Sequence, residues 1–316
     1  MIAFLLYAVV AAGVVFASIK ASQYVDMIDR TTKLSGAFLG GVLLSAVTSL
    51  PELFTSLSAT VFLDKPGLCI SNILGSDLFN LAILSVMMLL TARSAGRYRF
   101  ARGNIMVALY MALIYGFMLV DYAGFRVHLG TINLLTPIFA VIYILAVRHL
   151  SGEESEPDAD EGSSVTLPLK SIVLRFVAAS AAIIGLSIFI TYITDYISVR
   201  YSICEGLAGA LFLGVATSLP EVSSTIALFR MKNYDIAVGN IVGSNLFNIM
   251  VLCIADVVGW RQSVYVYDDP HMEGLLLFGA VAAAATLPML GIRNRALRIA
   301  CAVVIMGCYA AFLARG

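Results

Sequence analysis

Apolar residues fill most of the chain in runs of about 20, separated by short charged or turn-rich breaks. A run of this length predicts a transmembrane helix, because about 20 helical residues cross the hydrocarbon core of a bilayer. Ten such runs occur, at residues 2–19, 36–63, 68–92, 103–121, 127–147, 171–193, 202–230, 235–259, 272–291 and 296–314. The pattern predicts an all-α polytopic membrane protein with ten transmembrane helices.

The longest polar segment, SGEESEPDADEGSS at residues 151–164, lies between the fifth and sixth runs. It divides the chain into a five-helix half at 1–150, an acidic cytoplasmic linker at 151–170 and a second five-helix half at 171–316. The segment lacks the ligand spacing and the glycine of an EF-hand loop. A solvated, disordered linker is therefore the favoured interpretation over a calcium sensor.

Composition agrees with a membrane protein, since 60% of the residues are hydrophobic, 13% are charged and the mean hydropathy is +0.93. Soluble domains contain about 25% charged residues. The net charge is zero and no basic tract is present, so a nucleic-acid partner is not expected. The five cysteines show no metal-binding spacing and are interpreted as small apolar core residues.

The Lys and Arg residues are distributed unevenly between the two sets of alternate loops. Fifteen of the twenty fall in one set and five in the other set with the termini. By the positive-inside rule the first set is cytoplasmic, and both termini lie outside. A prokaryotic cell (inner) membrane is the expected location.

Two blocks of sequence occur twice. TSLPE at 48–52 returns unchanged at 217–221, and SNILGSDLFN at 71–80 matches GNIVGSNLFN at 239–248 in seven of ten positions. The motif blocks, 46–80 and 215–248, are separated by five predicted helices, an odd number. Equivalent helices therefore run in opposite directions, and the halves are predicted to be inverted repeats, as in many secondary transporters.

Each TSLPE block places a carboxylate and a helix breaker inside an apolar run. A Glu at membrane depth costs about 2.5–3.5 kcal/mol even on mild insertion scales, so Glu52 and Glu221 are functional candidates. Proline frees a backbone carbonyl that must find a partner in lipid, and a cation is one such partner. Candidate hydroxyl ligands precede each break, at Thr48, Ser49, Thr217 and Ser218.

The second blocks each form a polar stripe, because Asn72, Ser76 and Asn80 recur at helical spacing, as do Asn240, Ser244 and Asn248. Asp77 can share the face of Asn80, whereas its counterpart is Asn245. Oxygen ligands of this kind suit Ca²⁺ or Na⁺ and disfavour zinc, copper or iron. The candidate metal site comprises Glu52, Glu221, Asn80, Asn248, Asp77, Thr48, Ser49, Thr217, Ser218, Ser76 and Ser244.

The repeated TSLPE blocks, each followed by N-x-x-G-S-x-x-x-N, resemble the two alpha repeats of the sodium/calcium exchanger family, prokaryotic type, in the calcium:cation antiporter superfamily. The resemblance implies an alternating-access antiporter that binds Ca²⁺ and Na⁺ in turn. It also implies that Glu52, Glu221, Asn80 and Asn248 form the central site, and that hydroxyls of both motifs occupy ligand positions.

The chain departs from the family pattern at several positions. Val47 and Ala216 replace the usual glycine before TSLPE, which affects helix packing or hinge freedom there. Asn248 stands where the potassium-dependent branch has Asp, which argues against potassium co-transport. Asp77 is atypical and could alter ion choice or proton coupling. The TSLPE motif differs from that of the calcium/proton exchanger branch.

The first hypothesis for function is therefore exchange of calcium for sodium, with no cofactor and with inorganic cations and the lipid bilayer as partners. A monomer is the working assumption. A calcium/proton antiporter of the same fold is the alternative, and a cation channel is a less favoured one. An enzyme is not expected, since the repeated core contains no catalytic motif.

Overall fold

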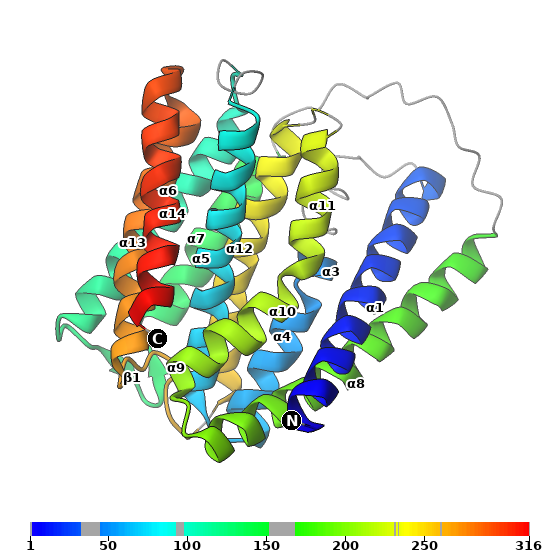
Figure 1. Ribbon diagram of the computed structural model, residues 1–316, viewed down its shortest axis with the longest axis vertical. Coiled ribbons are helices and arrows are strands. Elements are labelled where there is room, and N and C mark those ends of the chain that lie inside the picture. The colour runs from blue at the N-terminus through cyan, green and yellow to red at the C-terminus, as the bar shows by residue number, and fades with distance from the viewer. Residues whose placement is uncertain are drawn as a thin grey trace.

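Figure 1 shows the computed structural model of the chain. The structure describes residues 2–32, 45–92, 98–151, 168–230, 232, 234–259 and 261–315. The first part of the predicted run 36–63 and nearly all of the acidic linker 151–170 lie outside the described residues.

The described elements are almost all helical. The long helices are α1 (Ile2–Thr32), α5 (Pro66–Leu90), α6 (Arg102–Tyr122), α7 (Leu135–Ser151), α8 (Leu169–Tyr201), α12 (Tyr234–Val258), α13 (Pro270–Gly291) and α14 (Arg295–Arg315). Shorter helical pieces are α3 (Ser45–Thr48), α4 (Leu50–Leu57), η2 (Ser58–Phe62), α9 (Glu205–Ala208), η4 (Gly209–Gly214), α10 (Val215–Thr217) and α11 (Leu219–Arg230). The segments η2 and η4 are π-helical.

Seven described helices are long and apolar enough to cross a membrane, namely α1, α5, α6, α8, α12, α13 and α14. An eighth candidate is a bent pair, Glu205–Thr217 with Leu219–Arg230, whose parts meet at 48°. The apolar part of α7 is shorter, at Leu135–Arg148. The chain is thus an all-helical membrane protein, and the number of ten transmembrane helices stays a prediction.

The predicted helix at 127–147 is wrong at its beginning. Residues 128–133 form a small antiparallel ribbon of β1 (His128–Leu129) and β2 (Ile132–Asn133), and the helix begins only at Leu135. Gly130 takes a positive φ of 70° in the turn, a conformation that glycine adopts without strain. Residues 127, 129 and 132 are apolar, so the sequence pattern extended the predicted transmembrane helix over this ribbon.

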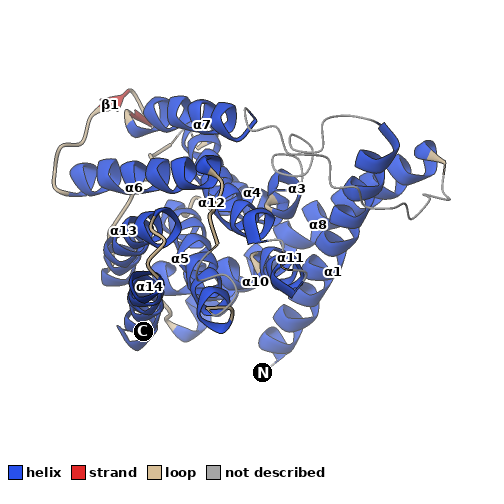
Figure 2. Cartoon of the chain, turned by 90° about the horizontal axis from the view of Figure 1, so that it is seen from above, coloured by secondary structure: helices blue, strands red, loops and turns tan. Residues whose placement is uncertain are grey.

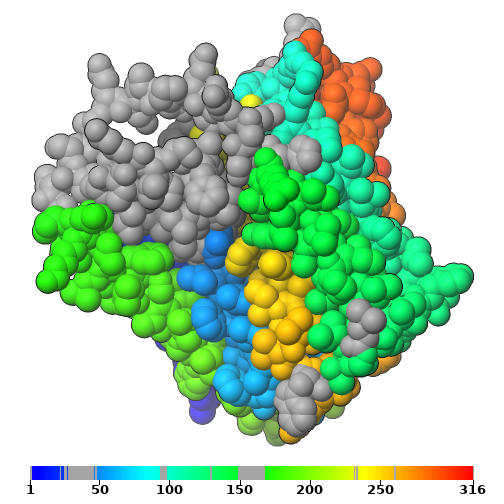
Figure 3. Space-filling model, turned by 180° about the vertical axis from the view of Figure 1, so that it is seen from behind, coloured from blue at the N-terminus to red at the C-terminus, as the bar shows by residue number. Residues whose placement is uncertain are grey.

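The helices form a central group with flanking helices on two sides (Figure 2). α4, α5, α10, α11 and α12 occupy the middle, α6, α7, α13 and α14 lie on one side, and α1 and α8 lie together on the other. The largest hydrophobic cluster runs through all three groups and includes Val10 of α1 and Ile190 of α8, whereas Ala17, Ala21 and Ile183 form a separate small cluster between α1 and α8. On the reverse face α4, α12 and α7 lie side by side (Figure 3).

Small residues let α5 and η4 approach closely. A Cβ on Gly75 would lie 2.5 Å from the Ala210 Cα, and one on Gly209 would lie 1.9 Å from the Ser71 Oγ. Such backbone contact is typical of membrane helix interfaces, where small residues replace bulky ones. It brings the segment before the second motif directly against the helix that carries the polar stripe of the first.

Candidate ion-binding site

Both TSLPE motifs interrupt their helices at the serine. Ser49 ends α3 and precedes α4 with φ −90° and ψ 10°, and Ser218 separates α10 from α11 with φ −84° and ψ 0°. These angles lie in the sparsely populated bridge region, so each serine takes the same local break. Pro51 and Pro220 follow at the start of the next helix, where a missing N–H costs little.

The two breaks are joined by a reciprocal pair of hydrogen bonds. The Ser49 hydroxyl donates to the Glu221 carboxylate at 3.1 Å, and the Ser218 hydroxyl donates to the Glu52 carboxylate at 3.2 Å. All four side chains are buried, with at most 1% exposed. The carboxylate of each motif therefore lies at the helix break of the other motif, in the interior of the protein.

The polar stripes of α5 and α12 also meet each other. Asn80 donates to the Asn245 side-chain oxygen at 2.9 Å, while Asn248 donates to the Asp77 carboxylate at 3.0 Å. The Asn245 amide in turn donates to the backbone oxygen of Asp77 at 3.0 Å. Because Asp77 and Asn245 are equivalent in the repeat, these contacts are again reciprocal.

Asn72 and Asn240 hold each stripe against its own broken helix. Asn72 donates to Thr55 and Ser56 on α4, both at 3.0 Å. Asn240 donates to Thr225 on α11 at 3.1 Å and to the Glu221 backbone oxygen at 3.3 Å. These amides orient the two halves of each motif, and their side-chain oxygens remain available.

Many oxygen atoms of this region have no hydrogen-bond partner among the residues that the structure describes. The buried atoms without a partner include Oε2 of Glu52 and Glu221, Oδ2 of Asp77, Oδ1 of Asn72, Asn80, Asn240 and Asn248, and Oγ of Ser244. Buried polar groups are normally satisfied, so a concentration of unpaired acceptors needs an explanation. Hard cations such as Ca²⁺ and Na⁺ bind carboxylate, amide and hydroxyl oxygens of this kind.

No basic side chain compensates these carboxylates among the described residues. The ion pairs found there involve Lys65, Arg126, Arg261 and His271, and none of them reaches Glu52, Asp77 or Glu221. An uncompensated buried carboxylate is costly, whereas a cation bound between such groups offsets that cost. The donor set therefore fits a cation.

All eleven residues of the predicted site are buried in this region. Two of its hydroxyls bond to backbone oxygens, Ser76 to Gly214 across the α5–η4 contact and Thr217 to Leu213 within its own helix. Their direct part in ion binding stays a prediction, as does that of Thr48. The four glutamate and asparagine positions of the predicted centre each have an unpaired acceptor oxygen among the described residues, as do Asp77 and Ser244.

Asn245 and Tyr115 belong to the surroundings of the site and were not among the predicted residues. Asn245 bridges α12 to α5 through both of its amide atoms. Asn245 occupies the position equivalent to Asp77 in the aligned repeats, and this equivalence was the signal that could have identified it. Tyr115 on α6 lies near Asp77 and packs against Gly279, where a Cβ would lie 2.9 Å from the Tyr115 hydroxyl. No repeated motif marks Tyr115.

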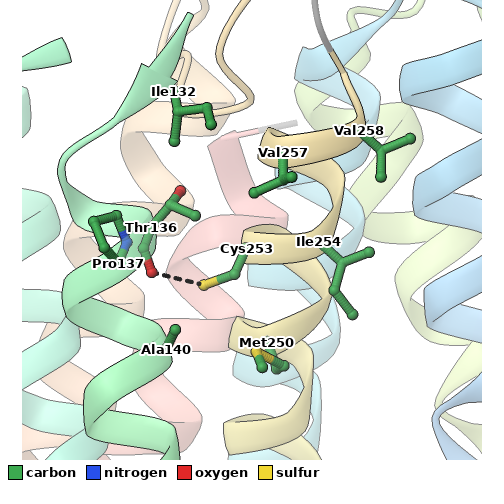
Figure 4. A pocket seen from close by; sticks show the side chains of 9 residues that line it. All are labelled: Ile132, Thr136, Pro137, Ala140, Met250, Cys253, Ile254, Val257 and Val258. Carbon is green, nitrogen blue, oxygen red and sulfur yellow. Dashed lines mark hydrogen bonds between the residues drawn. The ribbon is translucent and has the colours of Figure 1, made fainter. Parts of the chain in front are cut away.

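A pocket without carboxylates lies elsewhere among the described residues. It has a volume of about 490 Å³ and lies between α7 and α12, among Thr136, Pro137, Met250, Cys253 and neighbouring apolar residues (Figure 4). Its only drawn polar contact is that of the Cys253 thiol with the Thr136 backbone oxygen at 3.5 Å. It contains no carboxylate and does not suit a cation.

Known proteins resemble this chain in sequence and in fold. The inner membrane protein YrbG of Escherichia coli is 25% identical over 231 residues, which cover 72% of this chain and 70% of YrbG. The sodium-calcium exchanger NCX_Mj has a similar fold, with a TM-score of 0.63, 16% identity and coverage of 99% and 98% of the two chains. The H⁺/Ca²⁺ exchanger CAX likewise has a TM-score of 0.68 at 14% identity, covering 99% of this chain and 89% of CAX.

The sequence profile described as "Sodium/calcium exchanger protein" matches residues 2–151 and 171–315, which include both motif blocks. The match leaves out the acidic segment between the halves. The chain therefore belongs to the sodium/calcium exchanger protein family.

Proposed function

We propose that this protein is a secondary active antiporter that exchanges Ca²⁺ for Na⁺ across the membrane. The observation that carries the proposal is the pair of buried carboxylates, Glu52 and Glu221, each bonded to the serine of the other motif and each left with an unpaired oxygen. Two carboxylates balance one Ca²⁺, and sodium ions can neutralise the same charges in turn.

Competition for the same carboxylates explains obligatory exchange. An empty site leaves buried negative charges uncompensated, and moving them through the membrane core is expensive. A loaded site is neutralised and can be exposed alternately to the two sides. The reciprocal contacts between the motifs support a two-fold relation between halves, as the predicted inverted repeats require.

A calcium/proton antiporter is the second candidate function. It is favoured by Asp77, a third buried carboxylate within the same group of contacts, which could carry a proton while the glutamates bind the ion. The fold of the H⁺/Ca²⁺ exchanger CAX is compatible with this alternative. Because of Asp77, the proton is the coupling ion that needs to be tested beside sodium.

Reconstitution into liposomes tests the proposal. Vesicles loaded with Na⁺ are diluted into sodium-free buffer with radioactive Ca²⁺, and a proton gradient replaces the sodium gradient in a parallel sample. We expect uptake that requires internal Na⁺. Uptake driven only by protons would support the second candidate, uptake without any counter-ion would indicate a channel, and no uptake would contradict calcium as the substrate.

Membrane orientation is the remaining part of the proposal. The N- and C-terminal ends lie toward the same end of the helices (Figure 1), and the charge distribution puts this end outside the cell. Labelling of cysteines introduced near residue 315 with an impermeant maleimide in intact cells tests this orientation. Modification only after membrane disruption would reverse the assignment.

A further inference from the structure

Three side chains that commonly bind transition metals meet at the ends of α9 and α13, outside the carboxylate site. The Cys204 Sγ lies 3.1 Å from the His271 Nδ1, and this nitrogen lies 3.6 Å from the Asp269 Oδ1. One ligand atom from each residue lies within 4.8 Å of the others. All three residues are half-buried, so an ion from solution can reach them.

The local sequence fixes the Asp269 carboxylate in place. Asp269 caps α13, and its Oδ1 accepts the backbone N–H groups of His271 at 2.8 Å and Met272 at 3.0 Å. Its Oδ2 accepts the N–H of Gly206 at 3.0 Å. A Cβ at Gly206 would lie 2.5 Å from Oδ1, so the close approach of α9 to α13 requires glycine there.

The cluster retains unused ligand capacity. A carboxylate offers about four lone-pair positions, and three N–H groups use three of them, so one position remains on the Asp269 Oδ2. The second ring nitrogen of His271, Nε2, is buried and has no hydrogen-bond partner among the described residues, so it can carry the ring proton and leave the Nδ1 lone pair for an ion. Cys204 is the half-buried member of the five cysteines, whereas the other four are buried.

We propose that Cys204, Asp269 and His271 form a binding site for Zn²⁺ or a similar borderline transition-metal ion, separate from the transport site. Thiolate, imidazole and carboxylate are the ligands of zinc, and three of them with a water complete a tetrahedron. Ideal zinc distances put the sulfur and nitrogen roughly 3.5 Å apart. The observed 3.1 Å needs only a small separation to admit the ion.

The ligand types separate the two sites chemically. The carboxylate site offers only oxygen ligands, which suit Ca²⁺ and Na⁺, whereas sulfur and nitrogen ligands select zinc-like ions. An ion bound here would tie α9, the start of the bent helix pair that carries Glu221, to the beginning of α13. The inference does not depend on which cation is transported.

Cobalt binding to the purified full-length protein tests the site. Co²⁺ is titrated in the presence of saturating Ca²⁺, and a thiolate-to-cobalt charge-transfer band is recorded before Zn²⁺ is added to displace it. We expect one equivalent of Co²⁺ and complete displacement by Zn²⁺. Cys204→Ser should abolish the band, and His271→Ala should weaken Zn²⁺ binding by more than about 100-fold, beyond the usual cost of losing an outer-sphere partner.

Cys301→Ser is the matched control, since Cys301 is buried on α14, and it should keep the band. Absence of the band from the wild type, or its persistence in Cys204→Ser, would overturn the proposal. If Cys204→Ser fails to fold, the site is tested in the wild-type protein by protection of the Cys204 thiol from maleimide. Zn²⁺ but not Ca²⁺ should slow maleimide modification of Cys204, and equal rates in both would contradict the site.

Discussion

The two motif halves of this protein share their sequence pattern but differ in charge and in backbone. Each half supplies a serine that bonds to the other half's glutamate. Within its motif block, however, the first half contributes two buried carboxylates, Glu52 and Asp77, whereas the second contributes Glu221 alone among the described residues, because Asn245 is the repeat equivalent of Asp77. The duplicated framework thus tolerates an asymmetric distribution of charge.

The described π-helical segments lie on different sides of the two motifs. In the first half η2 follows the motif at Ser58–Phe62, whereas in the second half η4 precedes it at Gly209–Gly214. π-helical turns are rare and occur frequently at functional sites. The glycines at the two ends of η4, Gly209 and Gly214, permit its close contact with α5.

Removing either central carboxylate is the strongest test of equivalence between the halves. Glu52→Gln and Glu221→Gln should each reduce calcium exchange by more than about 100-fold, because loss of one charge costs over about 2.7 kcal/mol at a site that needs both. Radioactive Ca²⁺ uptake into sodium-loaded liposomes measures the effect. Asp64→Asn, an exposed acidic residue paired with Arg261, is the control and should retain activity. Substantial exchange in one of the two variants would show that the halves are not equivalent.

Adding one methyl group at Gly75 tests the close contact between the halves. Gly75→Ala should lower the free energy of unfolding by about 1–3 kcal/mol, since overpacking forces α5 away from Ala210. Thermal unfolding in detergent reports the change. Gly116→Ala is the control in α6, where a Cβ would meet nothing within 4 Å. Equal stability of both variants would mean that the α5–η4 contact adapts freely.

Removing the Asp77 carboxylate, or moving it to the equivalent position 245 in the second half, tests the role of this charge in ion choice. Asp77→Asn should weaken Ca²⁺ binding by about tenfold, or about 1.4 kcal/mol, without abolishing exchange, because an amide oxygen still accepts the hydrogen bond from Asn248. Calcium-concentration series in the liposome assay give the apparent affinity. The double variant with Asn245→Asp should restore it. Complete loss of transport in Asp77→Asn would instead make this carboxylate a member of the essential set.

The smallest expected effect concerns the two crossing serines. Ser49→Ala and Ser218→Ala each remove one hydrogen bond to a buried carboxylate and should lower exchange by about fivefold, near the net value of about 1 kcal/mol for a hydrogen bond. Initial uptake rates should fall equally in the two variants. An effect confined to one serine would show that the two hydrogen bonds, although equivalent in geometry, contribute unequally to transport.

Sequence patterns predicted the membrane class and both helix breaks, and they selected eleven candidate residues that the structure buries, because duplication makes polar residues in apolar runs conspicuous. They misplaced the start of α7, since apolar residues in the β-ribbon imitate a helix. They also treated Cys204 as an apolar core residue, although it meets His271 from a distant part of the chain. The repeat indicates which residues lie close together within one half, but it does not indicate which side chains of the two halves form hydrogen bonds with each other.

The sequence by itself determined which residues are costly to bury and where the helices must break. Those properties are local: a glutamate or a proline in an apolar run has the same cost wherever the run packs. Only the tertiary structure decided that Ser49 faces Glu221, that Asn245 bridges to Asp77, and that Cys204 meets His271. Such pairings depend on helix packing between residues 67 to 172 positions apart, for which periodicity and composition contain no distance information.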